Sequence, residues 1–215
     1  MAELFIVEYL VENGSDINKA ANNGETPLIS ACSWNYNTAV VRYLLKNGAD
    51  VNLVDKYGNT ALTSSVLVGN EIVDMLIENG ADINKVNING ETPLFRLCRF
   101  KYRSSVISLI TNGADINKVN NKGETPLFIA CKYLKKKWNI TLIEYLIENG
   151  ADINKVNNKG ETPLFKLCKF NNKYIIDYFI KHGAKVNVKN KNGITPLDIA
   201  NLNNNKEIIP YLIEK

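Results

Sequence analysis

Few residues in the chain could carry catalytic or metal chemistry. There is one histidine, His182, among 215 residues, and no reactive side chain accompanies it at a spacing typical of a catalytic dyad or triad. The glycine patterns GxxxxGK[ST] and GxGxxG, which cradle phosphates, are also missing. We therefore expect a protein that is not an enzyme and that has no catalytic residue, no bound metal ion and no cofactor.

The four cysteines do not resemble a ligand set. Cys32, Cys98, Cys131 and Cys168 are far apart in the sequence, and no two stand as close as in a CxxC zinc motif. Each occupies the same position near the end of an expected helix. Neighbouring helices are about 8–10 Å apart, whereas a disulfide needs Cα atoms within about 7 Å. We predict four buried free thiols, which suit a reducing compartment.

Long apolar runs and a strong charge of one sign are missing too. No segment approaches the roughly 20 apolar residues of a membrane-spanning helix, and the apolar start Met1–Val11 contains Glu3 and Glu8 and no basic residue. The net charge of +4 comes from 26 basic and 22 acidic residues that are distributed along the chain. These features predict a cytoplasmic or nuclear protein without a membrane segment, and they do not favour non-specific nucleic-acid binding.

One segment returns along the whole sequence. Gly113–Phe128 is identical to Gly150–Phe165, and Gly80–Phe95 differs from them only at Ile88 and Asn89. Looser copies begin at Gly14, Gly48 and Gly183. In all six copies a second glycine follows the first by ten positions, whereas successive copies begin 34, 32, 33, 37 and 33 residues apart. The loop between the glycines is therefore constant, and the segments that connect the loops vary.

Each copy predicts the end of one helix and the start of the next. An apolar run with helical spacing, such as Ile143–Ile147, precedes Asn149-Gly150, which is typical of a helix C-terminus because glycine adopts the left-handed conformation without strain. After the second glycine comes Thr-Pro-Leu, in which threonine suits the N-cap and proline the first helical position. The nine residues between the glycines predict an extended, turn-bearing hairpin. His182 precedes Gly183, at the position where the other copies have an asparagine before their first glycine, so we expect it to cap a helix.

The repeated unit consists of a helix, Asn-Gly-Ala-Asp-Ile-Asn, a polar tip, Gly-Glu-Thr-Pro-Leu and a second helix, and it returns with a period near 33 residues. This unit resembles the ankyrin repeat. The resemblance covers essentially the whole chain. It implies an all-α repeat solenoid of helix-turn-helix pairs joined by short β-hairpin loops, in a single domain over residues 1–215. We expect a half-repeat or capping helix at 1–14, internal repeats at 22–50, 56–82, 89–115, 122–152 and 159–185, and a C-terminal capping repeat at 192–215.

The sequence departs from the family pattern in several places. The histidine that usually follows Thr-Pro-Leu and ties neighbouring loops is replaced by Ile29, Thr63, Phe95, Phe128, Phe165 and Asp198, and we expect apolar packing to replace its hydrogen bonds in most repeats. Ser105 and Ser108 stand where other copies have an apolar residue and usually a tyrosine, which predicts a weak link or a shifted helix. The Leu134–Trp138 stretch holds four extra residues that form a second contact site or a solvated loop. Pro210 predicts a helix that begins near Lys206.

The resemblance also implies where a partner binds, because ankyrin repeats usually hold partners at the hairpin tips and on the concave side of the first helices. Carried over by position, the concave residues are Trp34, Arg99, Phe100, Lys132, Tyr133, Lys169 and Phe170. The tip residues are Lys56, Tyr57, Ile88, Lys122, Lys159 and Lys191. Aromatic and arginine side chains often dominate interface energies. The alternative is that the aromatic side chains shield the base of the groove and the lysines are solvated.

We therefore predict a monomeric, nonenzymatic scaffold for protein–protein interaction. Arg99, Lys132 and Lys169 would select an acidic or aromatic-acidic segment of another protein and steer its approach. Two alternatives remain. The basic and aromatic residues could bind single-stranded nucleic acid, although the small net charge counts against this. The chain could also be the targeting region of a longer enzyme or adaptor protein, as the half-repeat at its start suggests.

Overall fold

The structure is a computed structural model that describes residues 2–34, 38–65, 70–99, 103–134 and 138–213. It divides into two compact units, residues 1–115 and 116–215. Unit 1 contains α1 (Ala2–Glu12), α2 (Pro27–Trp34), α3 (Thr38–Lys46), α4 (Ala61–Ser64), α5 (Asn70–Glu78), α6 (Pro93–Arg99) and α7 (Arg103–Thr111). Unit 2 contains α8 (Pro126–Lys132), α9 (Trp138–Glu148), α10 (Pro163–Leu167), α11 (Lys173–Lys181), α12 (Pro196–Leu202) and α13 (Ile209–Ile213).

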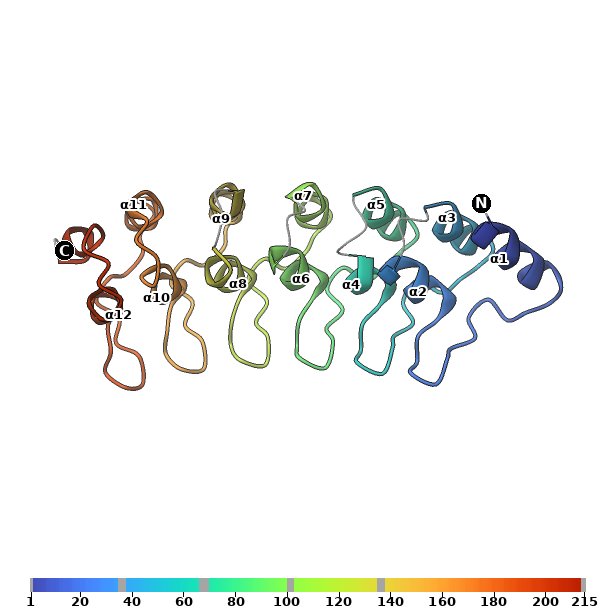
Figure 1. The fold of residues 1–215 in the computed structure, drawn as a ribbon, viewed down its shortest axis with the longest axis horizontal. Helices are drawn as coiled ribbons and strands as arrows, with labels where there is room; N and C mark the ends of the chain where they lie inside the picture. Colours follow the sequence, from blue (N-terminus) through green and yellow to red (C-terminus); the bar gives the residue numbers. More distant parts are fainter. Residues whose placement is uncertain (1, 35–37, 66–69, 100–102, 135–137, 214–215) are drawn as a thin grey trace. The chain divides into compact units, whose positions relative to one another are not determined.

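Each unit has an inner layer and an outer layer of helices (Figure 1). In unit 1 the inner helices α2, α4 and α6 pack in sequence order, and the outer helices α3, α5 and α7 do the same. In unit 2, α10 packs between α8 and α12. The hairpin loops project from the inner layer, and their described residues form turns without a regular strand. The predicted all-α repeat solenoid is confirmed, while the single-domain organisation and its repeat boundaries stay predictions.

The inner helices begin where the sequence predicts. Proline occupies the first position of five of them, and before three of these prolines the threonine hydroxyl accepts a hydrogen bond from an amide of the first turn. The hydroxyls of Thr92 and Thr162 make no such bond. Thr125 Oγ1 accepts a hydrogen bond from the Phe128 amide at 3.3 Å, and Thr195 forms a reciprocal capping box with Asp198. α4 has Ala61 in place of proline, but Thr60 still accepts a bond from the Thr63 amide at 3.1 Å. The threonine cap therefore does not require a proline after it.

The outer helices end through side-chain caps that precede the first glycine of each loop. Asn47 Nδ2 donates to the Tyr43 carbonyl at 2.8 Å, and the same bond forms at Asn13, Asn79, Asn112 and Asn149. His182 replaces this amide: its Nδ1 donates to the Tyr178 carbonyl at 2.7 Å, and its ring stacks on that of Tyr178 at 4.0 Å between centroids. The expected capping role of His182 is confirmed.

Asparagine side chains also tie successive loops together. Asn52 Nδ2 donates to the Gly80 carbonyl at 3.0 Å, while its Oδ1 accepts from the Asp82 amide at 2.8 Å. In unit 2, Asn154 makes the same two bonds to Gly183 and Lys185, both at 2.8 Å. Phe95, Phe128 and Phe165 are buried, as expected for the positions where the family has histidine. The hydrogen bonds between loops are nevertheless present, and asparagine supplies them.

The tips of the hairpins contact one another through the main chain. In unit 1 the Lys56 amide donates to the Asn23 carbonyl at 2.8 Å, and the Ile88 amide donates to the Tyr57 carbonyl at 2.9 Å. Gly24, with a φ of 79°, lies so close to the next tip that an added Cβ would be 2.8 Å from the Lys56 nitrogen. The second glycine of a loop thus has two roles: it allows the left-handed backbone of its own turn, and it leaves room for the main chain of the next tip.

The four cysteines are free and buried, as predicted. Burial raises the pKa of Cys32 and of Cys168 to about 12, and it raises the pKa of Cys98 as well. These thiols are therefore protonated at neutral pH and are poor nucleophiles or ligands. Within the described ranges there is no cluster of three histidine, cysteine or acidic residues that could hold a metal ion.

α7 keeps the register of the other outer helices. Ser105 is 1% exposed, and its apolar counterparts in the neighbouring helices are buried as well. Ser108 donates a hydrogen bond to the Asp74 carboxylate of α5. The prediction of a possible shift in this helix is wrong. α13 begins at Ile209, three residues after the predicted start, because residues 206–208 form a turn, and the exposed Pro210 occupies its second position.

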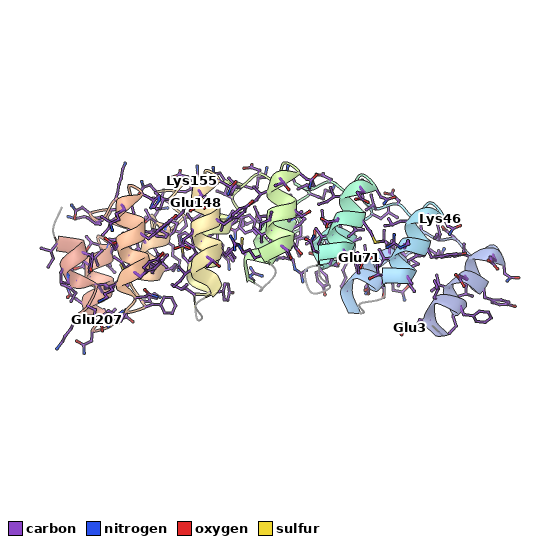
Figure 2. The ribbon with its side chains drawn as sticks, turned by 90° about the horizontal axis from the view of Figure 1, so that it is seen from above. Glu3, Lys46, Glu71, Glu148, Lys155 and Glu207 are labelled. Atoms are coloured by element: carbon purple, nitrogen blue, oxygen red, sulfur yellow. The ribbon has the colours of Figure 1, made fainter. Side chains whose placement is uncertain are left out.

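The outer helices carry charges of both signs. Figure 2 labels Lys46 at the end of α3, Glu71 on α5 and Glu148 at the end of α9, and all three are exposed. Arg42 of α3 pairs with Glu71 at 3.0 Å, and both side chains are largely exposed. Among the described residues, no helix is long and apolar enough to cross a membrane. The described residues that are predicted to bind a partner lie at the ends of the inner helices, in the turns that follow them and at the hairpin tips.

Candidate partner-binding surface

The structure exposes all six predicted tip residues. Tyr57 is 51% exposed and Ile88 is 61% exposed. The four remaining tip positions are occupied by lysines, Lys56, Lys122, Lys159 and Lys191, and each is exposed. Lys56 Nζ lies 5.0 Å from the centroid of the Tyr57 ring, which is a distance typical of a cation–π contact. The tips therefore combine exposed positive charges with large apolar side chains, although their role in binding stays a prediction.

The concave residues of unit 2 lie at the ends of two inner helices. Lys132 closes α8, and its Nζ lies 5.9 Å from the centroid of the Tyr133 ring, which is 38% exposed. Lys169 is exposed and Phe170 is half-buried in the turn after α10, where the Phe170 amide donates to the Leu167 carbonyl at 2.8 Å. Each position thus presents a lysine next to an aromatic ring, as the sequence predicts.

Part of the predicted concave surface cannot be placed. Phe100 and residues 135–137 of the Leu134–Trp138 insertion lie outside the described residues. Trp34 ends α2 and Trp138 begins α9, but only their backbones belong to the described structure. Leu134 is buried. These positions stay predictions as partner contacts.

Arg99 has a different environment from the one that the sequence suggests. Its guanidinium pairs with the Glu91 carboxylate at 2.5 Å, and the Glu91 side chain is only 8% exposed. Arg99 thus joins the end of α6 to the hairpin that precedes the same helix, and much of its charge is used within the repeat. The position of Glu91 after the second glycine places it close to α6 in the sequence pattern, but the pattern does not say which basic residue of the helix it binds.

A cavity of about 230 Å³ opens beside this ion pair. It is lined by Tyr57, Asn59, Asn87, Ile88, Asn89, Glu91, Arg96 and Arg99. Asn87 Nδ2 donates to Asn59 Oδ1 at 3.1 Å, so a side-chain bond joins the two hairpins that form its wall. We call it the Arg96 cavity, after a basic residue of its wall that the sequence pattern did not identify.

Arg96 is half-buried in the wall of this cavity. Burial lowers the pKa of Arg96, and the positive charge of Arg99 lowers it further, while Glu91 and Asp55 act in the opposite direction. An arginine remains charged at neutral pH under such conditions. The described residues give Arg96 no ion pair of its own, since Glu91 is bound to Arg99.

The corresponding position in repeat five has a different arrangement. Lys166 pairs with Glu161 at 2.8 Å, both side chains are largely buried, and Lys166 Nζ lies 5.3 Å from the centroid of the Phe128 ring. Burial raises the pKa of Glu161, but the hydrogen bond and charge of Lys166 and the hydrogen bond from Asn157 outweigh this, so the pKa is lower than usual. In repeat five the glutamate thus binds the basic residue at the Arg96 position and leaves Lys169 exposed, whereas in repeat three the glutamate binds Arg99.

Comparisons with known proteins agree with this architecture. A family model described as ankyrin repeats in three copies matches residues 2–87, 83–157 and 135–215. The crystal structure of the human ASB11 ankyrin repeat domain is similar, with a TM-score of 0.81 and 27% sequence identity over 92% of this chain and 87% of that chain. No curated protein sequence matches the chain. Because the family model matches nearly every residue, the chain belongs to the ankyrin repeat family.

Proposed function

We propose that the protein is a nonenzymatic scaffold that binds a segment of another protein along its hairpin tips and inner helices. Ankyrin repeats are protein–protein interaction modules, and this supports the general function. The observation that carries the specific proposal is the exposure of Tyr57 and Ile88 at adjacent tips of unit 1. Large side chains of this kind provide contact area at interfaces when a partner removes them from water.

The charges of this surface favour an acidic partner. Lys56 is exposed in unit 1, and the tip lysines of unit 2 are exposed together with Lys132 and Lys169, each of which precedes an aromatic residue. Long-range attraction between such a surface and an acidic segment raises the association rate and selects against basic segments. The partner that fits best is therefore an acidic segment with aromatic or aliphatic side chains. A monomeric state and a cytoplasmic or nuclear location belong to the same proposal.

The test is an affinity capture from cell lysate with identification by mass spectrometry. The native chain is compared with a Tyr57→Ala, Ile88→Ala and Tyr133→Ala variant whose folding is verified by circular dichroism. Tyr174→Ala is the matched control, because Tyr174 is 55% exposed on the outer helix α11. Specific proteins that bind the native chain and the control, and are lost with the triple variant, support the proposal. If the same proteins remain bound to the triple variant, the tips are not the binding surface.

A further inference from the structure

We infer that the Arg96 cavity of unit 1 is a subsite for one carboxylate side chain, an aspartate or glutamate of the bound segment. This inference rests on the proposed function and names one chemical feature of the partner. The cavity lies between two adjacent hairpin tips, at the place where the Ile88 amide donates to the Tyr57 carbonyl at 2.9 Å. A segment that follows the tips of unit 1 passes over its opening.

The positive charge of the cavity comes from Arg96. Its wall contains two arginines and one glutamate, and the glutamate is bound to Arg99 at 2.5 Å. Asp55, the other carboxylate whose charge acts on Arg96, accepts hydrogen bonds from the amides of Tyr57 and Asn59, both at 2.8 Å. The cavity wall therefore has one positive charge in excess, and it lies on a half-buried guanidinium.

The asparagines of the wall are occupied by the hairpins themselves. Asn87 Oδ1 accepts from the amides of Asn89 and Glu91 at 2.9 and 3.1 Å, and its Nδ2 donates to Asn59. They fix the shape of the cavity and leave the Arg96 guanidinium as the main donor for a ligand. A guanidinium presents planar, paired N–H groups that match the two oxygens of a carboxylate.

Charge and size favour a carboxylate over a phosphate. A single carboxylate neutralises the one excess charge, whereas a phosphate dianion would leave a net negative charge beside the buried Glu91 carboxylate. A cavity of about 230 Å³ is smaller than the sites that enclose drug-sized ligands, and it suits one side chain. Tyr57 and Ile88 are exposed at its edge, so we expect a large apolar residue next to the acidic residue of the partner.

The experiment selects random displayed peptides on the immobilised full-length chain and measures the affinity of an enriched peptide by fluorescence anisotropy. We expect an aspartate or glutamate at one position with an apolar neighbour. Replacing that acid by its amide, or Arg96 by glutamine, should each weaken binding about tenfold, and the two changes together should weaken it no more than either alone. Arg96→Lys keeps the positive charge but lacks the planar, paired N–H groups of the guanidinium, so it should weaken binding less than Arg96→Gln. It is measured in place of Arg96→Gln if the glutamine variant does not fold.

Arg42→Gln is the matched control, because it removes one positive charge from the outer helix α3 of the same unit. It should leave the affinity unchanged. If binding depends on Tyr57 and Ile88 but neither on Arg96 nor on an acid, the proposed function stands and the carboxylate subsite is refuted. A phosphoserine peptide that binds more tightly than the aspartate peptide, in an Arg96-dependent manner, would replace the carboxylate by a phosphate. Failure to enrich any peptide counts against both proposals.

Discussion

Ser105 places a hydroxyl where neighbouring repeats have branched apolar side chains. It is 1% exposed, and its counterparts are Val40 in α3 and Ile72 in α5, both buried. We expect Ser105→Val to stabilise the protein by about 1 kcal/mol, because it adds buried apolar surface at a position where the fold already accommodates it. Chemical denaturation checks this as a higher transition midpoint with an unchanged slope.

The control for this substitution is Ser104→Val in the same helix, because Ser104 is exposed. That change should alter the free energy of unfolding by no more than about 0.5 kcal/mol. Equal effects at the two positions would show that Ser105 is not a defect in the core. Ser108 is a different case, since its hydroxyl donates to Asp74, and a tyrosine there would remove this bond.

Individual side-chain partners were the least predictable feature of the sequence. The pattern placed Arg99 at the end of its helix, where α6 has it, but it did not reveal that Glu91 binds it. Glu91 has the same position in its loop as Glu161, yet Glu161 pairs with Lys166 at a different helical position. Which basic residue each glutamate binds depends on the other side chains in the repeat, and a position-by-position comparison does not contain that information.

Among the elements, helix ends were predictable because they depend on nearby residues. The Thr-Pro and Asn-Gly pairs mark the N- and C-termini of the helices, in most cases through bonds within four residues, such as that from Asn47 to Tyr43. The asparagine bonds between loops were not predicted, because Asn52 and Gly80 are brought together only by the stacking of repeats. The predicted start of α13 was wrong, because a proline limits how far before it a helix can begin but does not fix the first helical residue.

Two loop glycines with the same backbone conformation should respond differently to substitution. Gly14 and Gly24 have φ values of 85° and 79°, so alanine is strained by about 1–2 kcal/mol at either position. At Gly14 nothing lies within 4 Å of an added Cβ, whereas at Gly24 the Lys56 nitrogen would be 2.8 Å away. We therefore expect Gly24→Ala to cost more stability than Gly14→Ala, because it also separates two adjacent tips.

Denaturant titrations of the two variants measure this difference, with Gly14→Ala as the control for backbone strain alone. Hydrogen exchange of the Lys56 amide supplies a second measurement, since its bond to the Asn23 carbonyl should open more often in the Gly24→Ala variant. Equal losses of stability together with unchanged exchange would mean that the tips are not held by this close approach.

At the scale of the molecule, each repeat depends on its neighbour for burial. The last helices of unit 2 illustrate this, because α12 packs on α10 and α13 packs on α11. Ala200 of α12, Leu212 of α13 and Ile208 in the turn before α13 are buried, and Asn205 Nδ2 donates to the Cys168 carbonyl at 2.9 Å. In a repeat array, the free energy of unfolding is approximately the sum of the contributions of the single repeats and of the interfaces between them. The loss of one repeat therefore also exposes a face of the next.

We therefore expect removal of residues 193–215 to lower the denaturation midpoint and to cause self-association, because α10 and α11 would expose the apolar side chains that α12 and α13 now cover. Size-exclusion chromatography with light scattering and denaturant titration measure the two effects.

The control keeps the repeat but replaces its exposed apolar residues, Leu202 and Ile213, which are 82% and 61% exposed, with lysine. This control should remain monodisperse with nearly unchanged stability. If the truncated chain is as monodisperse and as stable as this control, the last repeat covers no essential part of the core. The face of repeat five would then be stable in contact with water.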